Sequence, residues 1–303
     1  MRERALRSGV IPTSISLGNR EYSVAILVCL TFLCTAIAAA APAGAPESAH
    51  PDIHRLIHDM AYNEIQARER PAHLYKLKQR EWTPQSAQTS LEIETRRGNV
   101  SRLIRLNGHP PAEKQCQKNL SLLRRILSDP ALQQSRLRTQ RTEMRRRASL
   151  FVAMPRAFVF HFEGIEKDTG WVRLKYSPNP QFHPATRTAA VLQGLAGTMW
   201  IDPKAQRLVR INGRLVRSVT FGWGFLAKLY PGGHFEMEQS KVAGGNWHQT
   251  SLAVSLRGTE LIFKKLRVNL KETFASFQPV PNNITLAEAV HELERAPVQC
   301  AKQ

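Results

Sequence analysis

The stretch GTMWIDPKAQRLVRINGRLVRSVTF, residues 197–221, decides the fold class. Apolar and polar residues alternate along much of it, and a period of two is typical of half-buried strands. Two pairs interrupt the alternation, Asp202-Pro203 and Asn212-Gly213, and both are common turn formers. The stretch therefore predicts short antiparallel strands over residues 197–202, 207–213 and 214–221, joined by two turns.

Similar strand patterns extend in both directions from this stretch. They cover residues 73–82, 89–98, 101–108, 157–166, 171–178, 234–242, 247–258 and 261–277. The chain lacks the strand–helix alternation of a parallel α/β enzyme fold. We expect an α+β fold with a strongly curved antiparallel sheet, an open half-barrel of about 10–11 strands, wrapped around or covered by helices.

Helical patterns lie before, within and after the strands. Residues 51–71 carry an apolar stripe at helical spacing, and Thr285 to Glu288 form a capping box that opens a final helix. Between them, residues 111–153 indicate two helices inserted into the series of strands. The sequence predicts one domain over residues 51–298, with this helical pair as an insertion.

The first forty residues have the order of a secretory signal. A basic lead precedes the uncharged run from Val24 to Ala40, which closes on small residues. We expect cleavage near Ala40, a disordered linker over residues 41–50, and export to the periplasm or cell envelope. The alternative is an N-terminal membrane anchor, although the run is slightly short for a span.

Export leaves Cys116 and Cys300 in the mature chain. In an oxidising compartment two remaining cysteines can form one disulfide. Two separate thiols are the alternative, and the sequence leaves both open.

The chain is strongly basic, with a formal net charge of +19. Such a charge often indicates nucleic acid, but an exported protein meets other anions, so we expect no nucleic-acid partner. The partners considered are a lipid, an acylated protein, an anionic membrane surface or an acidic envelope partner. A solubilising surface is the plainer interpretation, and the oligomeric state is left open.

Six arginines are concentrated in the second inserted helix, which has only a sparse apolar face. They are Arg136, Arg138, Arg141, Arg145, Arg146 and Arg147. A basic helix of this kind can contact an anionic membrane or an acidic partner. The alternative is a solvated charged helix lying across the sheet.

Aromatic residues and glycines alternate from the end of the quoted stretch onward. Phe221, Trp223 and Phe225 share one face if the segment is a strand, while Gly222 and Gly224 take the other. Such a segment can bend around a cavity. We expect Met199 and Trp200, from the preceding hairpin, to line the same space. The segment then either lines a lipid-sized cavity or fills the open end of the sheet as part of the hydrophobic core.

The order of these elements resembles the LolA/LolB-type periplasmic lipoprotein carriers and receptors. The resemblance covers roughly residues 52–277 and depends on the architecture and on one hairpin, GTMWIDP followed by RLVRINGRLV. It implies a half-barrel that binds a lipid, an acyl chain or a lipoprotein. The chain is also similar to secreted bacterial proteins of this shape that have no assigned function.

No catalytic or metal-binding motif is present in the sequence. It has no G-x-S-x-G, H-E-x-x-H, P-loop or G-x-G-x-x-G pattern. We therefore expect no enzyme, no cofactor, no metal and no catalytic residue. Two hypotheses keep positive support: an exported carrier with an apolar cavity, and an envelope interaction module that uses its Arg-rich helix. A hydrolase with an unrecognised site is the third.

Overall fold

The computed structural model describes residues 52–69, 71–221, 226–261 and 264–301. Its twelve strands form one antiparallel sheet that is not closed, so the expected α+β class and antiparallel sheet are confirmed. Contacts divide the described chain into two compact units. The single domain over residues 51–298 stays a prediction. The expected signal segment and linker, residues 1–50, lie outside the described residues.

Unit 1 comprises residues 73–141 and 274–301 of the described chain. Its strands are β1 (Leu74–Trp82), β2 (Ala87–Ile93) and β3 (Val100–Leu106), and β1 lies beside the end of β12 (Lys264–Val280). Tyr75 and Phe277 mark this neighbourhood, with ring centroids 5.8 Å apart and planes at 88°. Edge-to-face packing of this kind stabilises two neighbouring aromatic rings.

Two helices pack against β2 and β3 in unit 1. They are α2 (Glu113–Ser128) and α5 (Leu286–Arg295), and Thr285 caps α5 in the expected capping box with Glu288. The core contains apolar residues from both helices and both strands, listed as Ile93, Val100, Leu123, Ile126, Leu286, Ala289, Val290 and Leu293. The two chain segments of unit 1 therefore share one core.

Unit 2 comprises residues 52–72 and 142–273 of the described chain. Its strands are β4 (Phe158–Ile165), β5 (Val172–Pro178), β6 (Leu195–Asp202), β7 (Arg207–Leu215), β8 (Val219–Phe221), β9 (Ala227–Leu229), β10 (His234–Lys241), β11 (Trp247–Glu260) and the first part of β12. The neighbours run β4-β5-β6-β7-β10-β11-β12, and β9 pairs with both β8 and β11. A short helix, α4 (Arg187–Ala190), and a 3-10 turn, η2 (Val191–Gly194), precede β6.

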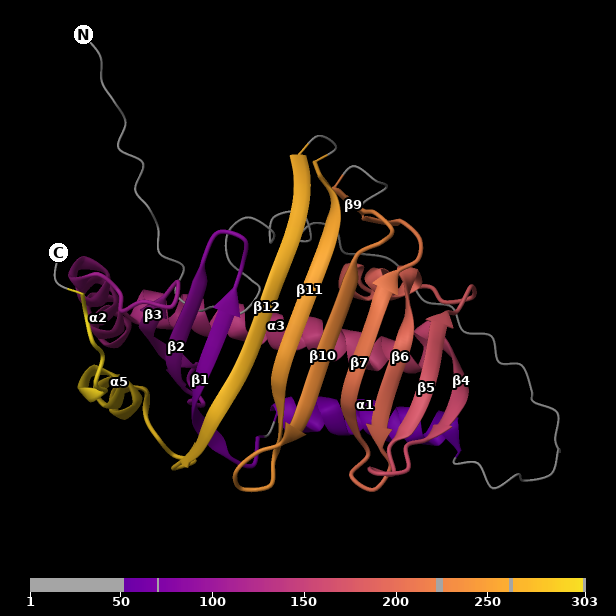
Figure 1. Ribbon diagram of the computed structural model, residues 1–303, viewed down its shortest axis with the longest axis horizontal. Coiled ribbons are helices and arrows are strands. Elements are labelled where there is room, and N and C mark those ends of the chain that lie inside the picture. Colours follow the sequence, from indigo (N-terminus) through magenta and orange to yellow (C-terminus); the bar gives the residue numbers. More distant parts are fainter. Residues whose placement is uncertain (1–51, 70, 222–225, 262–263, 302–303) are drawn as a thin grey trace, which may run out of the picture. The chain divides into compact units, whose positions relative to one another are not determined.

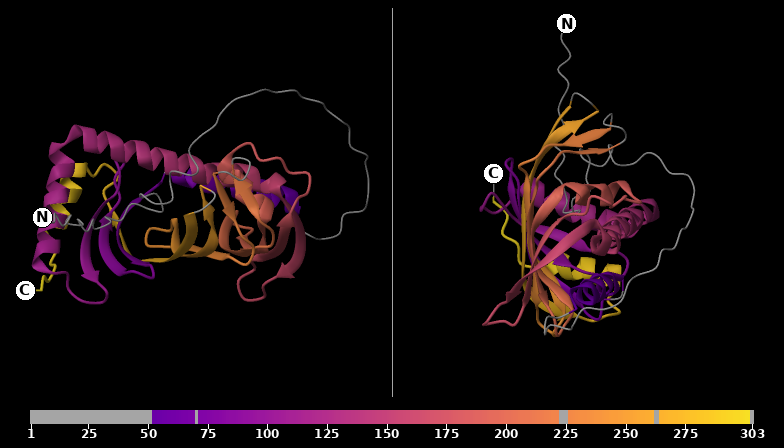
Figure 2. Two further views of the ribbon diagram at one scale, coloured as in Figure 1. Left: turned by 90° about the horizontal axis from the view of Figure 1, so that it is seen from above. Right: turned by 90° about the vertical axis from the view of Figure 1, so that its right-hand side faces the viewer.

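Helices cover one face of the sheet in unit 2. Figures 1 and 2 show α1 (Ile53–Glu69) and the end of α3 (Pro130–Ala157) on the same side of β4 to β7. Leu56, Met60 and Met154 from these helices pack with Leu174 and Ile211 from the strands in a single core. Alternate residues of the strands point away from the helices, as the period of two requires.

A buried ion pair fastens α1 to the turn between β6 and β7. Glu64 is fully buried, and its Oε1 accepts hydrogen bonds from Arg207 Nε at 2.7 Å and Leu208 N at 3.2 Å. Gln206 Nε2 donates to Asp59 Oδ2 at 2.9 Å, one turn earlier on the same helix. Burial and the charge of neighbouring Arg147 lower the pKa of Arg68, also on α1, to about 10.

The turn expected at Asn212-Gly213 is wrong, because β7 runs through both residues. Gly197 of β6 lies opposite Gly213, and the Tyr176 hydroxyl donates to the Asn212 carbonyl at 2.9 Å. A Cβ atom at Gly213 would collide with that hydroxyl and lie 2.8 Å from Phe235. The glycine therefore makes room for a buried tyrosine, and burial raises the pKa of Tyr176.

Candidate functional site

A pocket of about 670 Å³ opens in unit 2 where four segments meet. The start of α1, the end of α3, β4 and the loop after β5 each contribute lining residues, listed as Ile53, His54, Ile57, Pro155, Arg156, Phe158, Val159, Phe160, Asn179, Gln181, Phe182 and His183. Its volume falls within the range of small-molecule sites, about 300–1,000 Å³.

The loop that follows β5 is held in place by hydrogen bonds to its own backbone and to α3. Asn179 Nδ2 donates to the Arg156 carbonyl at 3.0 Å, and Asn179 N donates to the Ala157 carbonyl at 2.9 Å. Asn179 Oδ1 accepts from Gln181 N at 3.0 Å. Phe182 is consequently fixed at the wall of the pocket, and it is buried. The wall is preformed rather than assembled by a ligand.

The pocket is lined by both apolar and polar side chains, and among the described residues it has one cation, Arg156, at its edge. Ile57 and Phe158 are buried, and Phe160 is half-buried. Arg156, His54 and His183 are exposed at the edge, and none of the described residues that line the pocket has a carboxylate. A guanidinium binds carboxylates and phosphates through charge-assisted hydrogen bonds. The arrangement suits an amphiphile with an apolar tail and an anionic head.

The aromatic cavity expected from sequence is not this pocket. Met199 is fully buried and Phe221 is nearly so, and both belong to the core of unit 2. Trp200 lies on the opposite face of β6 from Met199, because consecutive strand residues alternate. The expectation that they line one space is therefore wrong. Trp223 and Phe225 lie outside the described residues.

Trp200 instead belongs to a polar cluster on the face away from the helices. Its indole Nε1 donates to Glu166 Oε1 at 2.6 Å, and the Arg210 guanidinium lies 5.4 Å from its ring centroid. Arg210 in turn pairs with Glu238 at 2.7 Å. The residue thus has a structural role on the outer face of the sheet.

A second apolar surface lies on the helix-side face of β10, β11 and β12 in unit 2. Met237 pairs with Leu252, Phe235 with Val254, Val254 with Leu270, and Leu256 with Val268. All of these side chains are half-buried. We call these residues the apolar strip, and it is an alternative position for an apolar ligand.

The Arg-rich segment belongs to α3, and its six arginines fall into two groups. Arg136 donates to the Asn99 carbonyl at 2.6 Å and its pKa is lowered by burial, while Arg146 pairs with Glu143 at 2.6 Å. Arg147 is half-buried. Arg138, Arg141 and Arg145 are exposed on the helix. Only half of the predicted contact set is therefore presented to solvent.

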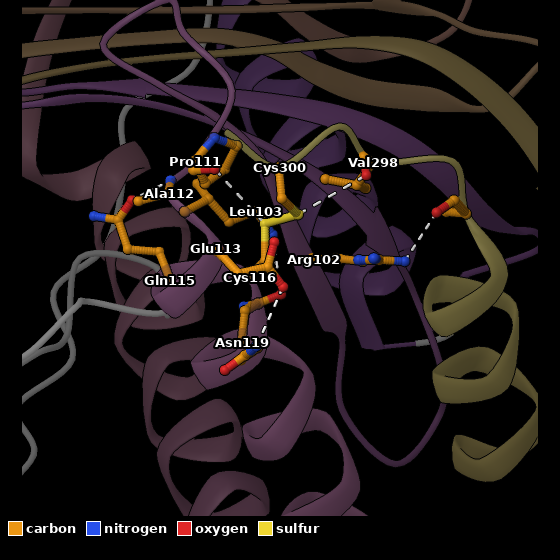
Figure 3. The surroundings of a disulfide bond; sticks show 12 residues. Arg102, Leu103, Pro111, Ala112, Glu113, Gln115, Cys116, Asn119, Val298 and Cys300 are labelled. Carbon is orange, nitrogen blue, oxygen red and sulfur yellow. Dashed lines mark hydrogen bonds between the residues drawn. A yellow bond between two sulfur atoms is a disulfide. The ribbon is translucent and has the colours of Figure 1, made fainter. Parts of the chain in front are cut away.

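Cys116 and Cys300 are joined by a disulfide in unit 1, with their Cα atoms 6.4 Å apart (Figure 3). The Ala301 backbone continues this attachment, because Ala301 N donates to the Pro111 carbonyl at 2.9 Å and its own carbonyl accepts from Glu113 N at 3.1 Å. Arg102 caps the end of α5 nearby, donating to the carbonyl of Leu293 at 2.6 Å. The C-terminal segment is thus fastened to the start of α2.

The part of the chain that the structure describes holds no group of three or more His, Cys, Asp or Glu side chains suited to a metal ion. Within the same residues, no helix is both long enough and apolar enough to cross a membrane.

Sequence reasoning missed the residues that form the pocket. The alternation of Phe158 and Phe160 was visible, and it identified a strand but not a ligand site. Arg156 and Phe182 come from segments that no sequence pattern connects, and only the fold brings them to one opening.

Comparison with known proteins does not assign the chain to a family. No protein-family model matches the chain, and no curated protein matches its sequence.

Proposed function

We propose that the protein is an exported, non-enzymatic binding protein for an amphiphile with an acyl tail and an anionic head. The pocket carries this proposal, because apolar side chains and the Arg156 guanidinium line one opening. The basic lead and apolar run of residues 1–40 support export to the periplasm or cell envelope. The open antiparallel sheet with helices on one face supports the LolA-like half-barrel.

The binding mode follows from the position of each group. The acyl tail packs between Phe158, Phe160 and Ile57, where burial of each methylene contributes about 0.8 kcal/mol. The head lies at the rim, where the Arg156 guanidinium pairs with its carboxylate or phosphate. His54 and His183 border the same opening.

Titration with a fluorescent fatty acid tests the proposal, together with native mass spectrometry of the mature protein for co-purified lipid. Arg156→Gln should weaken binding at least about tenfold, because a charge-assisted hydrogen bond is lost. Phe160→Ser should weaken it similarly by removing apolar contact. Leu270→Gln, on the apolar strip, is the matched control and should leave affinity unchanged.

The outcomes show whether the ligand binds in the pocket or on the apolar strip. A fatty alcohol of the same length should bind Arg156→Gln and the unaltered protein equally, because it has no charge to pair. Loss of binding in Leu270→Gln alone would place the ligand on the apolar strip. A protein that carries no lipid and binds no fatty acid would overturn the proposal.

A second candidate function is that of an envelope interaction module that uses α3. The exposure of Arg138, Arg141 and Arg145 favours it, since these side chains can reach an acidic partner. It predicts that Arg141→Gln with Arg145→Gln abolishes capture of that partner while fatty-acid binding is retained.

A further inference from the structure

One end of the sheet in unit 2 projects beyond its neighbours. The pairing of β10 with β11 ends at His234 and Ser255, whereas β11 continues to Glu260 beside β12 and β9. Figures 1 and 2 show β11 and the start of β12 rising past β10 and β7. We call this part, with β9 and Leu261, the projecting end.

Large apolar side chains are exposed at the projecting end. Leu261 is 55% exposed and Tyr230 is 39% exposed. Both are held by the backbone, since Leu261 N donates to the Leu226 carbonyl at 3.0 Å and Tyr230 N donates to the Arg257 carbonyl at 2.8 Å. The Leu261 φ of +48° is a conformation that leucine rarely adopts. Leu261 directly follows β11, where the chain turns toward β12, and this conformation leaves its side chain exposed.

Five cations surround these side chains. They are Lys228, Arg257, Lys264, Lys265 and Arg267. Register fixes their spacing: Arg257 lies directly opposite Arg267, and Thr259 lies between Lys228 and Lys265.

Carboxylates are few among the described residues of the projecting end. Its one carboxylate among the described residues is Glu260, which is buried and lies 3.7 Å from Lys264 Nζ. Arg257 and Lys265 are exposed, so their positive charge is available to an external anionic surface.

We propose that the projecting end docks on an anionic phospholipid bilayer. Leu261 enters the interface, Tyr230 lies at headgroup level, and the five cations contact lipid phosphates. An acidic polysaccharide would need the cations alone, whereas exposed apolar and tyrosine side chains beside cations are typical of membrane interfaces. The inference concerns a different surface from the pocket and does not depend on the proposed function.

Vesicle co-sedimentation tests this proposal with the mature protein. Binding to vesicles of phosphatidylglycerol and phosphatidylcholine should exceed binding to pure phosphatidylcholine, and should fall as salt is raised. Arg257→Gln with Lys265→Gln should weaken binding by about twentyfold or more, at about fivefold per cation. Leu261→Asn should weaken it by about tenfold.

The variants are chosen so that folding is not in question. Asparagine tolerates a positive φ better than leucine, so Leu261→Asn should fold at least as well as the unaltered protein. Lys175→Gln with Lys204→Gln removes the same charge from exposed positions elsewhere in unit 2, and should bind as the unaltered protein does.

Four results would overturn the proposal. The first is no preference for anionic vesicles. The second is an equal loss in the Lys175 and Lys204 variant, which would reduce the effect to net charge. The third is loss of vesicle binding in Arg141→Gln with Arg145→Gln but not in the projecting-end variants, which would place docking on α3. Binding to an acidic polysaccharide without binding to vesicles would also contradict it.

Discussion

Removing the buried carboxylate of Glu64 should destabilise unit 2 more than any exposed charge can. The Glu64→Ala variant leaves the Arg207 guanidinium, only 12% exposed, without its carboxylate. It also leaves Leu208 N–H without its acceptor. Breaking a buried ion pair costs about 3–5 kcal/mol. For a unit of this size we expect the melting temperature to fall by about 6–20 °C.

Two further substitutions separate charge from hydrogen bonding. Glu64→Gln keeps an oxygen acceptor and loses only the charge, so it should cost about 1–3 kcal/mol. Glu64→Met with Arg207→Leu replaces both partners by apolar groups and should recover most of the loss. Glu69→Ala, at an exposed position of the same helix, should change stability by less than about 0.5 kcal/mol.

The assay is urea and thermal unfolding followed by circular dichroism, at low salt and at about 0.5 M NaCl. The Glu64→Ala effect should persist at high salt, because a buried pair is poorly screened. Equal stability of Glu64→Ala and Glu69→Ala would refute the reasoning, and so would a double variant no more stable than Glu64→Ala.

Three other predictions concern the two units. Replacing Cys116 and Cys300 by serine should lower the free energy of unfolding in urea by up to about 5 kcal/mol, because the disulfide closes a loop of 184 residues. Dithiothreitol should not lower the stability of this variant further. Gly213→Ala should cost about 1–3 kcal/mol by overpacking, measured by thermal unfolding, and an unchanged melting temperature would contradict the packing described. The hydrogen bond from Arg124 lowers the pKa of Glu294 below its ordinary 4.5. This interaction therefore stabilises unit 1 above pH 4.5, and the stabilisation is lost as the pH falls through the folded-state pKa. Arg124→Gln should flatten the acid unfolding profile between about pH 5 and pH 3.

Local patterns identified most of the secondary structure. Strand alternation is a direct consequence of one buried and one exposed face, so β5 and β6 could be predicted from it. The capping box at Thr285 is equally local. The turn predicted at Asn212-Gly213 was wrong because glycine is used both in turns and at positions in strands where a side chain would not fit. Gly213 is of the second kind, since it leaves room for Tyr176, and the sequence does not distinguish the two.

The candidate site could not be predicted, because its members are far apart in sequence. Ile57, Arg156 and Phe182 come from different segments and meet only when the helices dock on the sheet. The aromatic segment that begins at Phe221 was a stronger sequence signal for a ligand site, yet Phe221 packs in the hydrophobic core of unit 2. Aromatic composition indicates where apolar area is buried and does not distinguish a ligand wall from a filled interior.

The interleaved connectivity of the two units sets an order of assembly for a chain that emerges from its N-terminus. Unit 2 has its last described strand residue at Thr273, whereas unit 1 needs β12 from Phe274 onward and α5. Until α5 emerges, α2 and β2 present an incomplete core to their surroundings. Cys116 can form its disulfide only after Cys300 has emerged, so this bond forms after the strands of both units have been made.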